Sequence, residues 1–281
     1  EEFLELKLTQ NALYHARAIE ETFDLIINNY IEFERKLFDL SIDYVIHSYR
    51  NYFDFYKTRS ALNSKLISLL TSVTLYRDTL KQHVKKCLPE QPDIKAKIDD
   101  LFDSKRENDN FLFMENLRNY IQHFGLPIHN VTYHSNVTSL DEDRMIEYSI
   151  EIQSLRNSIF TDLKMKNLFE SKIDEEIDLK RFTRVYVEMI GEIHICIRNS
   201  IEENVNHYRT KIEKTQKLYS DNKSEGFSGL KASKIDNNKI IESVPLLLEW
   251  DDVRKKLIKQ NDNLNNLRKC YVTGVIHKDS K

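Results

Sequence analysis

The scarcity of glycine and proline limits the fold of this chain more than any other feature. Only 5 Gly and 4 Pro occur in 281 residues, far below average usage. These two residues most often end or interrupt helices, and apolar residues recur at helical spacing along most of the sequence. The sequence therefore predicts a mainly α fold, a bundle of long antiparallel helices that forms a single helical domain over residues 1–281.

The helical pattern and its stop signals define the expected elements. Thr9 is a candidate N-cap of the first helix, and Pro89 and Pro92 end the second. The expected helices cover residues 9–56, 60–88, 93–103, 111–124, 155–170, 178–219 and 245–271.

One segment of the chain has the period of a strand instead of a helix. Apolar and polar residues alternate over 146–152, which is typical of a half-buried strand, and 131–137 supplies a candidate partner strand. We expect one β-hairpin inserted at about 128–152, with its turn at 139–143.

The stretch 221–238 breaks the helical pattern in another way. It is rich in Ser, Asn, Lys and Gly, a composition typical of mobile connections. We expect a mobile loop between two helices here. The sequence contains nothing that supports a role of this loop in gating a substrate.

Charge, cysteine content and hydropathy narrow the class of protein. The formal net charge is −3, so bulk electrostatics argues neither for nucleic-acid binding nor against a local basic patch. Cys87, Cys196 and Cys270 are far apart and odd in number, which favours reduced thiols in a cytoplasmic protein over a disulfide framework. No apolar run approaches the roughly 18 residues of a membrane span and no signal peptide opens the sequence, so we expect no membrane contact.

The expected 111–124 helix has the clearest boundaries in the chain. Asp109 or Asn110 is a candidate N-cap. Gly125 can adopt the left-handed conformation that ends a helix, and Pro127 cannot continue one. A buried stripe at helical spacing is expected to anchor this helix. The stripe consists of Phe113, Leu117, Tyr120, Ile121 and Phe124.

Arg118, Asn119 and His123 lie outside this stripe and suit the cleavage of a phosphodiester. Histidine both accepts and donates a proton near neutral pH, and the carbonyls at a helix end favour a cation there. Arginine presents a planar fork of donors that fits a phosphate. Asn119 precedes His123 by one helical turn, so it is positioned to orient the imidazole or a substrate oxygen.

The spacing of Arg118 and His123 separates the two side chains by about 140° around an ideal helix. One copy of the helix therefore grips a phosphate only if the long Arg118 side chain reaches around it. A homodimer that pairs two such helices is the easier geometry. The alternative is a purely structural helix end, in which Arg118 pairs with Glu115 and His123 caps the last carbonyls.

At these residues the chain resembles the HEPN superfamily (higher eukaryotes and prokaryotes nucleotide-binding domains). The signature of that family is an Arg, usually followed by a polar residue, with a His four to six positions after the Arg. Arg118, Asn119 and His123 match it, and the segment 113–123 also resembles stretches of uncharacterised bacterial proteins. The resemblance implies an α-helical bundle, frequent dimerisation, and metal-independent endoribonuclease activity in toxins and phage-defence systems. Many members have lost catalysis and only bind.

Gln122, His129 and His134 are further candidates for contact with a substrate, because they lie on or follow the same helix end. For the two histidines, exposed positions on the hairpin are the simpler interpretation. The pair Arg77 and His83 has similar spacing, but its basic surroundings favour a solvated helix face.

Metal-binding patterns are weak in this sequence, and we expect neither a metal nor another cofactor. The acidic cluster at 174–178 is explained by the preference of helix N-termini for carboxylates. His194 and Cys196 are two residues apart on a helix and so point in different directions.

Two functional hypotheses from different classes follow. In the first, the protein is an endoribonuclease whose partner is RNA, and His123 and Arg118 act on the 2′-hydroxyl and the phosphate. In the second, it is a non-catalytic helical scaffold or regulatory protein that binds another protein, because long helices with apolar stripes serve such contacts equally well.

Overall fold

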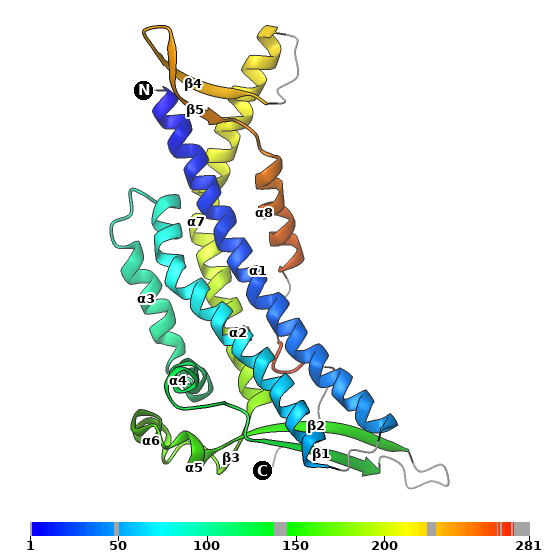
Figure 1. The fold of residues 1–281 in the computed structure, drawn as a ribbon. Coiled ribbons are helices and arrows are strands. Elements are labelled where there is room, and N and C mark those ends of the chain that lie inside the picture. The colour runs from blue at the N-terminus through cyan, green and yellow to red at the C-terminus, as the bar shows by residue number, and fades with distance from the viewer. Residues whose placement is uncertain are drawn as a thin grey trace. The chain divides into compact units, whose positions relative to one another are not determined.

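The structure, a computed structural model, is mainly helical, and three of its helices are unusually long (Figure 1). It describes residues 2–47, 51–137, 145–223, 229–262, 264, 266–270 and 272. The helices α1, α2 and α7 have 45, 36 and 45 residues, whereas a typical globular helix has about 11–12. The helices of the described ranges are α1 (Glu2–Ile46), α2 (Tyr52–Cys87), α3 (Ile94–Lys105), α4 (Asp109–His123), α5 (Arg156–Ile159), α6 (Leu163–Phe169), α7 (Leu179–Lys223) and α8 (Glu249–Gln260).

The boundary between α1 and α2 differs from the sequence-based expectation. α1 ends at Ile46 instead of continuing to residue 56, and α2 begins at Tyr52 instead of residue 60. The Asn51 side chain accepts a hydrogen bond of 3.1 Å from the backbone N–H of Asp54, which satisfies a donor at the start of α2. A polar cap without Gly or Pro therefore separates the two helices.

Two later helices are also shorter than expected. The segment 155–170 forms the two helices α5 and α6, because Asp162 interrupts it and accepts a 2.8 Å bond from the Lys164 N–H as the N-cap of α6. The last helix, expected over 245–271, is α8, which begins at Glu249 and ends at Gln260.

The hairpin expected at 128–152 is present. β1 (Asn130–Val137) and β2 (Ile146–Leu155) are antiparallel, with Asn130 opposite Gln153 and Val137 opposite Ile146. The expected turn at 139–143 lies outside the described residues. A short third strand, β3 (Glu176–Asp178), pairs with β2 and makes a three-stranded sheet in the order β1-β2-β3. With only three residues, β3 is too short to show the alternating pattern by which a strand is predicted from sequence.

A second hairpin corrects the expectation of a loop over 221–238. α7 continues to Lys223, and β4 (Lys231–Asp236) and β5 (Lys239–Pro245) form an antiparallel pair, whereas 224–228 lie outside the described residues. Asn237 and Asn238 connect the strands with φ of 47° and 63°. Consecutive positive φ values define the tight turn that suits the twist of a hairpin, and asparagine tolerates them. The described residues thus form two sheets instead of one inserted hairpin.

The chain divides into two compact units, each built from three separate segments. Unit 1 contains residues 1–25, 75–102 and 192–263. Unit 2 contains residues 26–74, 103–191 and 264–281, as far as these are described. The expectation of a single domain stays a prediction.

Contacts in unit 1 establish the directions of its long helices. The Cys87 thiol lies 3.5 Å from the Ala12 carbonyl oxygen, and the Phe23 and Tyr76 rings have centroids 6.0 Å apart. The residue numbers fall along α1 as they rise along α2, so these two helices are antiparallel. α7 is also antiparallel to α1, because Arg198 pairs with Glu20, and Lys211 pairs with Glu5 nearer the start of α1.

Unit 2 is held together by buried polar pairs as well as by apolar packing. Asn63 on α2 accepts a 2.9 Å bond from the Ile128 N–H and donates a 3.2 Å bond to the Ile128 carbonyl. Arg184 on α7 makes a two-pronged contact with Glu34 on α1, at 2.7 and 2.8 Å. The two bonds of Asn63 therefore hold the segment before β1 at a defined position on α2. The bidentate pair of Arg184 and Glu34 fixes the geometry of α7 against α1 and also contributes energy.

None of the helices in the described ranges combines the length and apolar character that crossing a bilayer requires.

Candidate functional site

The helix α4, which carries the predicted motif, is well anchored in unit 2. Its N-cap is Asn108, one residue before the expected candidates, and the Asn108 side chain accepts bonds from the N–H groups of Asn110 and Phe111 at 3.0 and 3.2 Å. One face of the helix is buried, as predicted. The buried residues are Phe111, Phe113, Met114, Asn116, Leu117 and Tyr120.

The C-terminal end of α4 differs in two details from the expectation. Phe124 is 52% exposed instead of buried, because it lies beyond the last helical residue, and its ring stacks on that of Tyr120. Gly125 does not adopt a left-handed conformation. The N–H groups of Phe124 and Gly125 both donate to the Tyr120 carbonyl, and a Cβ at Gly125 would lie 3.4 Å from the Tyr120 hydroxyl oxygen. Neither the backbone conformation nor the packing therefore requires glycine at this position.

Arg118 and Asn119 form a local pair on the partly exposed side of α4. The Arg118 guanidinium donates to the Asn119 side-chain oxygen over 3.3 Å. Glu115, the partner of Arg118 in the structural alternative, accepts a 2.6 Å bond from the Tyr186 hydroxyl and faces Arg106 at 3.7 Å. Arg118 makes no ion pair within the described part of the chain, so its charge is available to an anion.

His123 is the last residue of α4, and its side chain is exposed. Among residues 2–47, 51–137 and the other described ranges, no group forms a hydrogen bond with its imidazole. The capping bonds of the helix end are made by backbone groups instead. The contacts expected of a purely structural His123 are therefore not formed, and both ring nitrogens remain accessible to a ligand.

The remaining predicted substrate residues have different environments. Gln122 is exposed beside His123. His129 lies near the end of α4, with its ring centroid 6.5 Å from that of Tyr120, but its Nδ1 accepts the Leu155 N–H over 3.2 Å. His134 is bonded to Glu151 on the neighbouring strand at 2.8 Å.

The lowered pKa of His129 indicates that its ring is neutral. Burial lowers this pKa, and the nearby positive charge of Arg59 lowers it further. A neutral ring with an unprotonated Nδ1 is the state that accepts the Leu155 N–H. His129 and His134 thus both have structural partners in the sheet, and both are half-buried, whereas the simpler interpretation of the sequence expected exposed hairpin positions.

The second Arg and His pair of the sequence is part of the packing of unit 1. The Arg77 guanidinium lies over the Phe102 ring at 5.4 Å. The His83 and His15 Nδ1 atoms are 2.8 Å apart, and burial lowers the pKa of both rings. The solvated basic face expected here is present at the exposed Lys85 and Lys86, but His83 itself is half-buried against His15 from α1.

The acidic cluster at 174–178 serves the local structure. Asp178 accepts bonds from the N–H groups of Lys180 and Arg181 at the start of α7, at 2.9 and 3.2 Å. This confirms the helix N-terminus as the explanation for that carboxylate. The ranges that the structure describes contain no group of three or more side chains with the arrangement of metal ligands.

A cluster of buried polar side chains, which the sequence analysis did not identify, lies in the core of unit 1. His194 is fully buried, stacked on Phe23 at a centroid distance of 3.7 Å. Its Nδ1 lies 3.0 Å from the Tyr76 hydroxyl and its Nε2 lies 3.1 Å from a Glu20 oxygen. Arg198 donates to both oxygens of Glu20, at 3.0 and 2.8 Å. Cys196 is exposed, so it does point away from His194.

The protonation states in this cluster follow from burial and pairing. Burial by itself raises the pKa of Glu20, but the hydrogen bonds from His194 and Arg198 outweigh it and hold that pKa at about 2. Burial lowers the pKa of His194, although the bond to Glu20 opposes this. A neutral His194 with its proton on Nε2 donates to Glu20 and accepts from Tyr76, which satisfies all three groups.

Comparisons with protein-family models, with curated proteins and with solved structures find no match for this chain. The assignment of a function therefore depends on the site itself.

Proposed function

We propose that the protein is a metal-independent endoribonuclease of the HEPN type, acting in the bacterial cytoplasm as part of a toxin or phage-defence system. One observation carries the proposal. His123 is exposed at the end of a helix with a buried opposite face, four positions after Asn119 of the Arg118–Asn119 pair, and its ring has no hydrogen-bond partner in the described part of the chain.

The proposed reaction uses the 2′-hydroxyl of RNA as an internal nucleophile. That oxygen attacks the adjacent phosphorus, the bond from phosphorus to the 5′-oxygen breaks, and a 2′,3′-cyclic phosphate and a 5′-hydroxyl result. His123 removes the 2′ proton or donates a proton to the leaving oxygen. Arg118 stabilises the charge that develops on the phosphate oxygens, and Asn119 orients one of them. The reaction needs no metal or other cofactor.

We further propose that the active form is a homodimer. Arg118 and His123 lie on different sides of α4, so two copies of the helix place the two groups around one phosphate more easily than one copy does. Phe124 and Leu126, which flank this helix end, are each 52% exposed. Burial of apolar side chains against a second copy would contribute about 25 cal/mol per Å².

A second candidate function is that of a non-catalytic scaffold or regulatory protein that binds a partner protein. It is favoured by exposed apolar side chains near the end of α1. They are Phe38, Ile42, Val45 and Ile46. In this case His123→Ala would leave every activity of the protein unchanged.

Incubation of the purified protein with RNA in EDTA tests the ribonuclease proposal. We expect products with 2′,3′-cyclic phosphate ends, and no cleavage of a 2′-deoxy substrate, because it lacks the nucleophile. Arg118→Ala should abolish cleavage, whereas His207→Ala, which removes an exposed histidine from unit 1, should not. Cleavage that requires a divalent metal, or that survives Arg118→Ala, would contradict the proposed mechanism.

Mixing two inactive variants tests the two-copy arrangement. In a dimer of one Arg118→Ala and one His123→Ala chain, one composite site keeps both groups if they come from different copies. Random mixing should then restore about a quarter of the wild-type rate. If both groups act within one copy, the mixture will stay inactive.

A further inference from the structure

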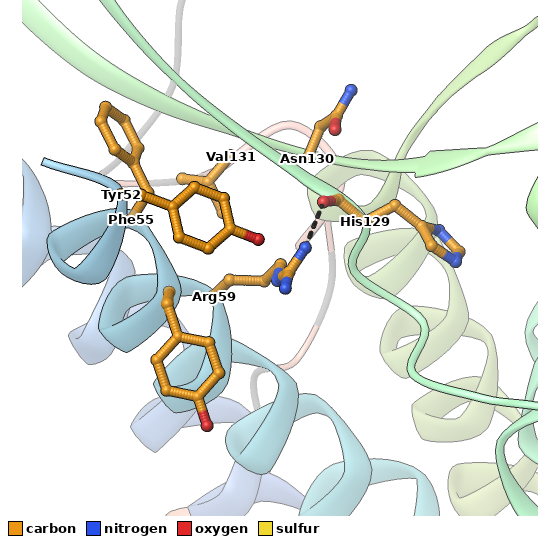
Figure 2. A pocket seen from close by; sticks show the side chains of 7 residues that line it. Tyr52, Phe55, Arg59, His129, Asn130 and Val131 are labelled. Carbon is orange, nitrogen blue, oxygen red and sulfur yellow. Dashed lines mark hydrogen bonds between the residues drawn. The ribbon is translucent and has the colours of Figure 1, made fainter.

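A pocket in unit 2 combines one cation with several aromatic rings. It is formed by the first turns of α2 and the segment that enters β1 (Figure 2). We call it the aromatic pocket. It is lined by Tyr52, Phe55, Tyr56, Arg59, His129, Asn130 and Val131.

Arg59 supplies the charge of the aromatic pocket. Its guanidinium donates to the His129 carbonyl oxygen over 3.3 Å, and Figure 2 shows the His129 imidazole pointing away from it. No carboxylate pairs with Arg59 within the described ranges. A guanidinium has five N–H donors, so one long bond leaves most of them for a ligand. The positive charge of Arg59 also lowers the pKa of His129, as a second cause that adds to the larger effect of burial.

The wall of the aromatic pocket is fixed before any ligand arrives. Asn63, one turn after Arg59, donates to the Arg59 carbonyl over 3.0 Å. The same buried amide exchanges two hydrogen bonds with Ile128, at 2.9 and 3.2 Å. The backbone of His129 is therefore held at a defined place beside α2. A preformed site loses less free energy on binding than one that must be ordered.

The rings of the aromatic pocket are unusually exposed for their size. Tyr52, Phe55 and Tyr56 are 78%, 39% and 49% exposed. Together with Arg59 they follow the i, i+3, i+4, i+7 spacing, so they share one face of α2. Aromatic side chains on such a face next to an arginine are the groups that hold unpaired bases in single-stranded RNA.

We propose that the aromatic pocket binds one unpaired nucleotide of a single-stranded RNA, with a phosphate on Arg59 and the base on the α2 rings. The cavity has a volume of about 220 Å³. Pockets that enclose a whole ligand have roughly 300–1,000 Å³, so this one accommodates part of a longer molecule. The inference rests on the proposed ribonuclease function for the identity of the ligand, and it gives that function a place where the substrate is anchored.

Binding of a fluorescent 2′-O-methyl oligonucleotide tests this proposal apart from cleavage, because such an RNA lacks the internal nucleophile. We expect Tyr52→Ala to weaken binding roughly 5- to 100-fold, as the loss of a stacking platform does. Arg59→Ala should also weaken binding and reduce its salt dependence by about one phosphate contact. Because Tyr52 is largely exposed, its variant will fold even if Arg59→Ala does not.

Matched controls remove a ring or a charge outside the aromatic pocket. Phe38 on α1 is 44% exposed and Lys57 on α2 is exposed, and neither lines the aromatic pocket, so Phe38→Ala and Lys57→Ala should bind the oligonucleotide as wild type does. Adenosine monophosphate alone should compete weakly, because it offers one phosphate and no neighbouring nucleotides. Competition by the mononucleotide as strong as by the RNA would overturn the assignment to RNA.

The outcomes separate this inference from the proposed function. If Tyr52→Ala and Phe38→Ala bind the oligonucleotide equally well, the aromatic pocket is not the binding site, even where wild-type protein cleaves RNA. If Tyr52→Ala alone loses binding, the inference holds, even where no RNA is cleaved.

Discussion

Two histidines near arginines on helices of this protein have opposite environments. His194 on α7 is fully buried in unit 1, where Glu20, Tyr76 and the ring of Phe23 occupy both its nitrogens and one face. His123 on α4 is exposed in unit 2, and its imidazole has no hydrogen bond within the described residues.

The difference shows that spacing alone does not identify a reactive histidine. Arg198 follows His194 by four positions and shares Glu20 with it, so that pair is closer in sequence and in space than Arg118 and His123. Every donor and acceptor of the His194 ring is nonetheless used by the core. A histidine that is available for chemistry is distinguished by its accessible nitrogens, which only the structure reports.

The largest effect that we expect is the loss of stability in His194→Ala. This variant leaves the buried Tyr76 hydroxyl without its partner, removes one of the donors to Glu20, which keeps Arg198, and opens a cavity against Phe23. We expect destabilisation by about 3–5 kcal/mol, as is typical when a buried charged network loses a member. Denaturant unfolding of wild type and variant measures it, and a loss under about 1 kcal/mol would mean that His194 is not part of a tight network.

The pH dependence of stability sharpens the same contrast. Because burial lowers the pKa of His194, the unfolded chain binds a proton below about pH 6.5 that the folded chain does not. Stability therefore falls as the pH decreases below that value, and for this group by up to about 1.4 kcal/mol per pH unit. Unfolding of wild type and His194→Gln from pH 7 to 5 should show a shallower slope in the variant. Parallel slopes would contradict a neutral buried ring.

Glu20 should extend this effect to lower pH. Its pKa of about 2 in the folded state lies below the ordinary value of 4.5, so its contribution is present above pH 4.5 and is lost as the pH falls toward 2. Glu20→Gln should remove this part of the acid sensitivity, and it should lower stability at pH 7 because Arg198 loses its partner. Acid unfolding followed by circular dichroism measures both, and an unchanged acid midpoint would be inconsistent with the pairing.

A smaller effect is expected for His83→Ala. The variant removes the half-buried bond to His15, a contact worth about 0.5–1.5 kcal/mol. Cleavage of RNA should stay at the wild-type rate, because His83 is in unit 1 and packs against α1. Loss of cleavage with an intact fold would assign the reaction to the Arg77 and His83 pair instead of to α4.

The smallest effect on stability is expected for His123→Ala. The side chain is exposed and caps no carbonyl in the described part of the chain, so the free energy of unfolding should change by less than about 0.5 kcal/mol. Thermal unfolding checks this. A drop comparable to that of His194→Ala would show that His123 is structural, which would remove the contrast between the two residues.

Local signals predicted much of the fold. The scarcity of Gly and Pro predicted the long helices, and the two-residue alternation predicted the β1–β2 hairpin. The break before α2 and the break before α6 depend on caps at Asn51 and Asp162, which resemble many other polar residues in the chain. The dipeptide Asn237-Asn238 is typical of a tight hairpin turn and so indicates the β4–β5 hairpin. The flanking strands are short and mostly exposed, however, so their sequence resembles that of a polar loop.

The candidate site was predictable only in part, for physical reasons. The polar face of α4 follows from its periodicity, which placed Arg118 and His123 off the buried stripe. The partners of His129 and His194 come from segments far away in the sequence, so no local pattern could reveal them. The same holds for the aromatic pocket, where Arg59 donates a hydrogen bond to the carbonyl oxygen of His129, a residue seventy positions later in the sequence.

The most direct test of the central claim is the rate at which wild type and His123→Ala cleave one unstructured RNA in EDTA, measured with each protein's unfolding midpoint. The claim is that the exposed histidine of α4 performs proton transfer. We predict that His123→Ala lowers the rate by at least about 100-fold while its midpoint stays unchanged. An equal rate from a folded His123→Ala protein would contradict the claim.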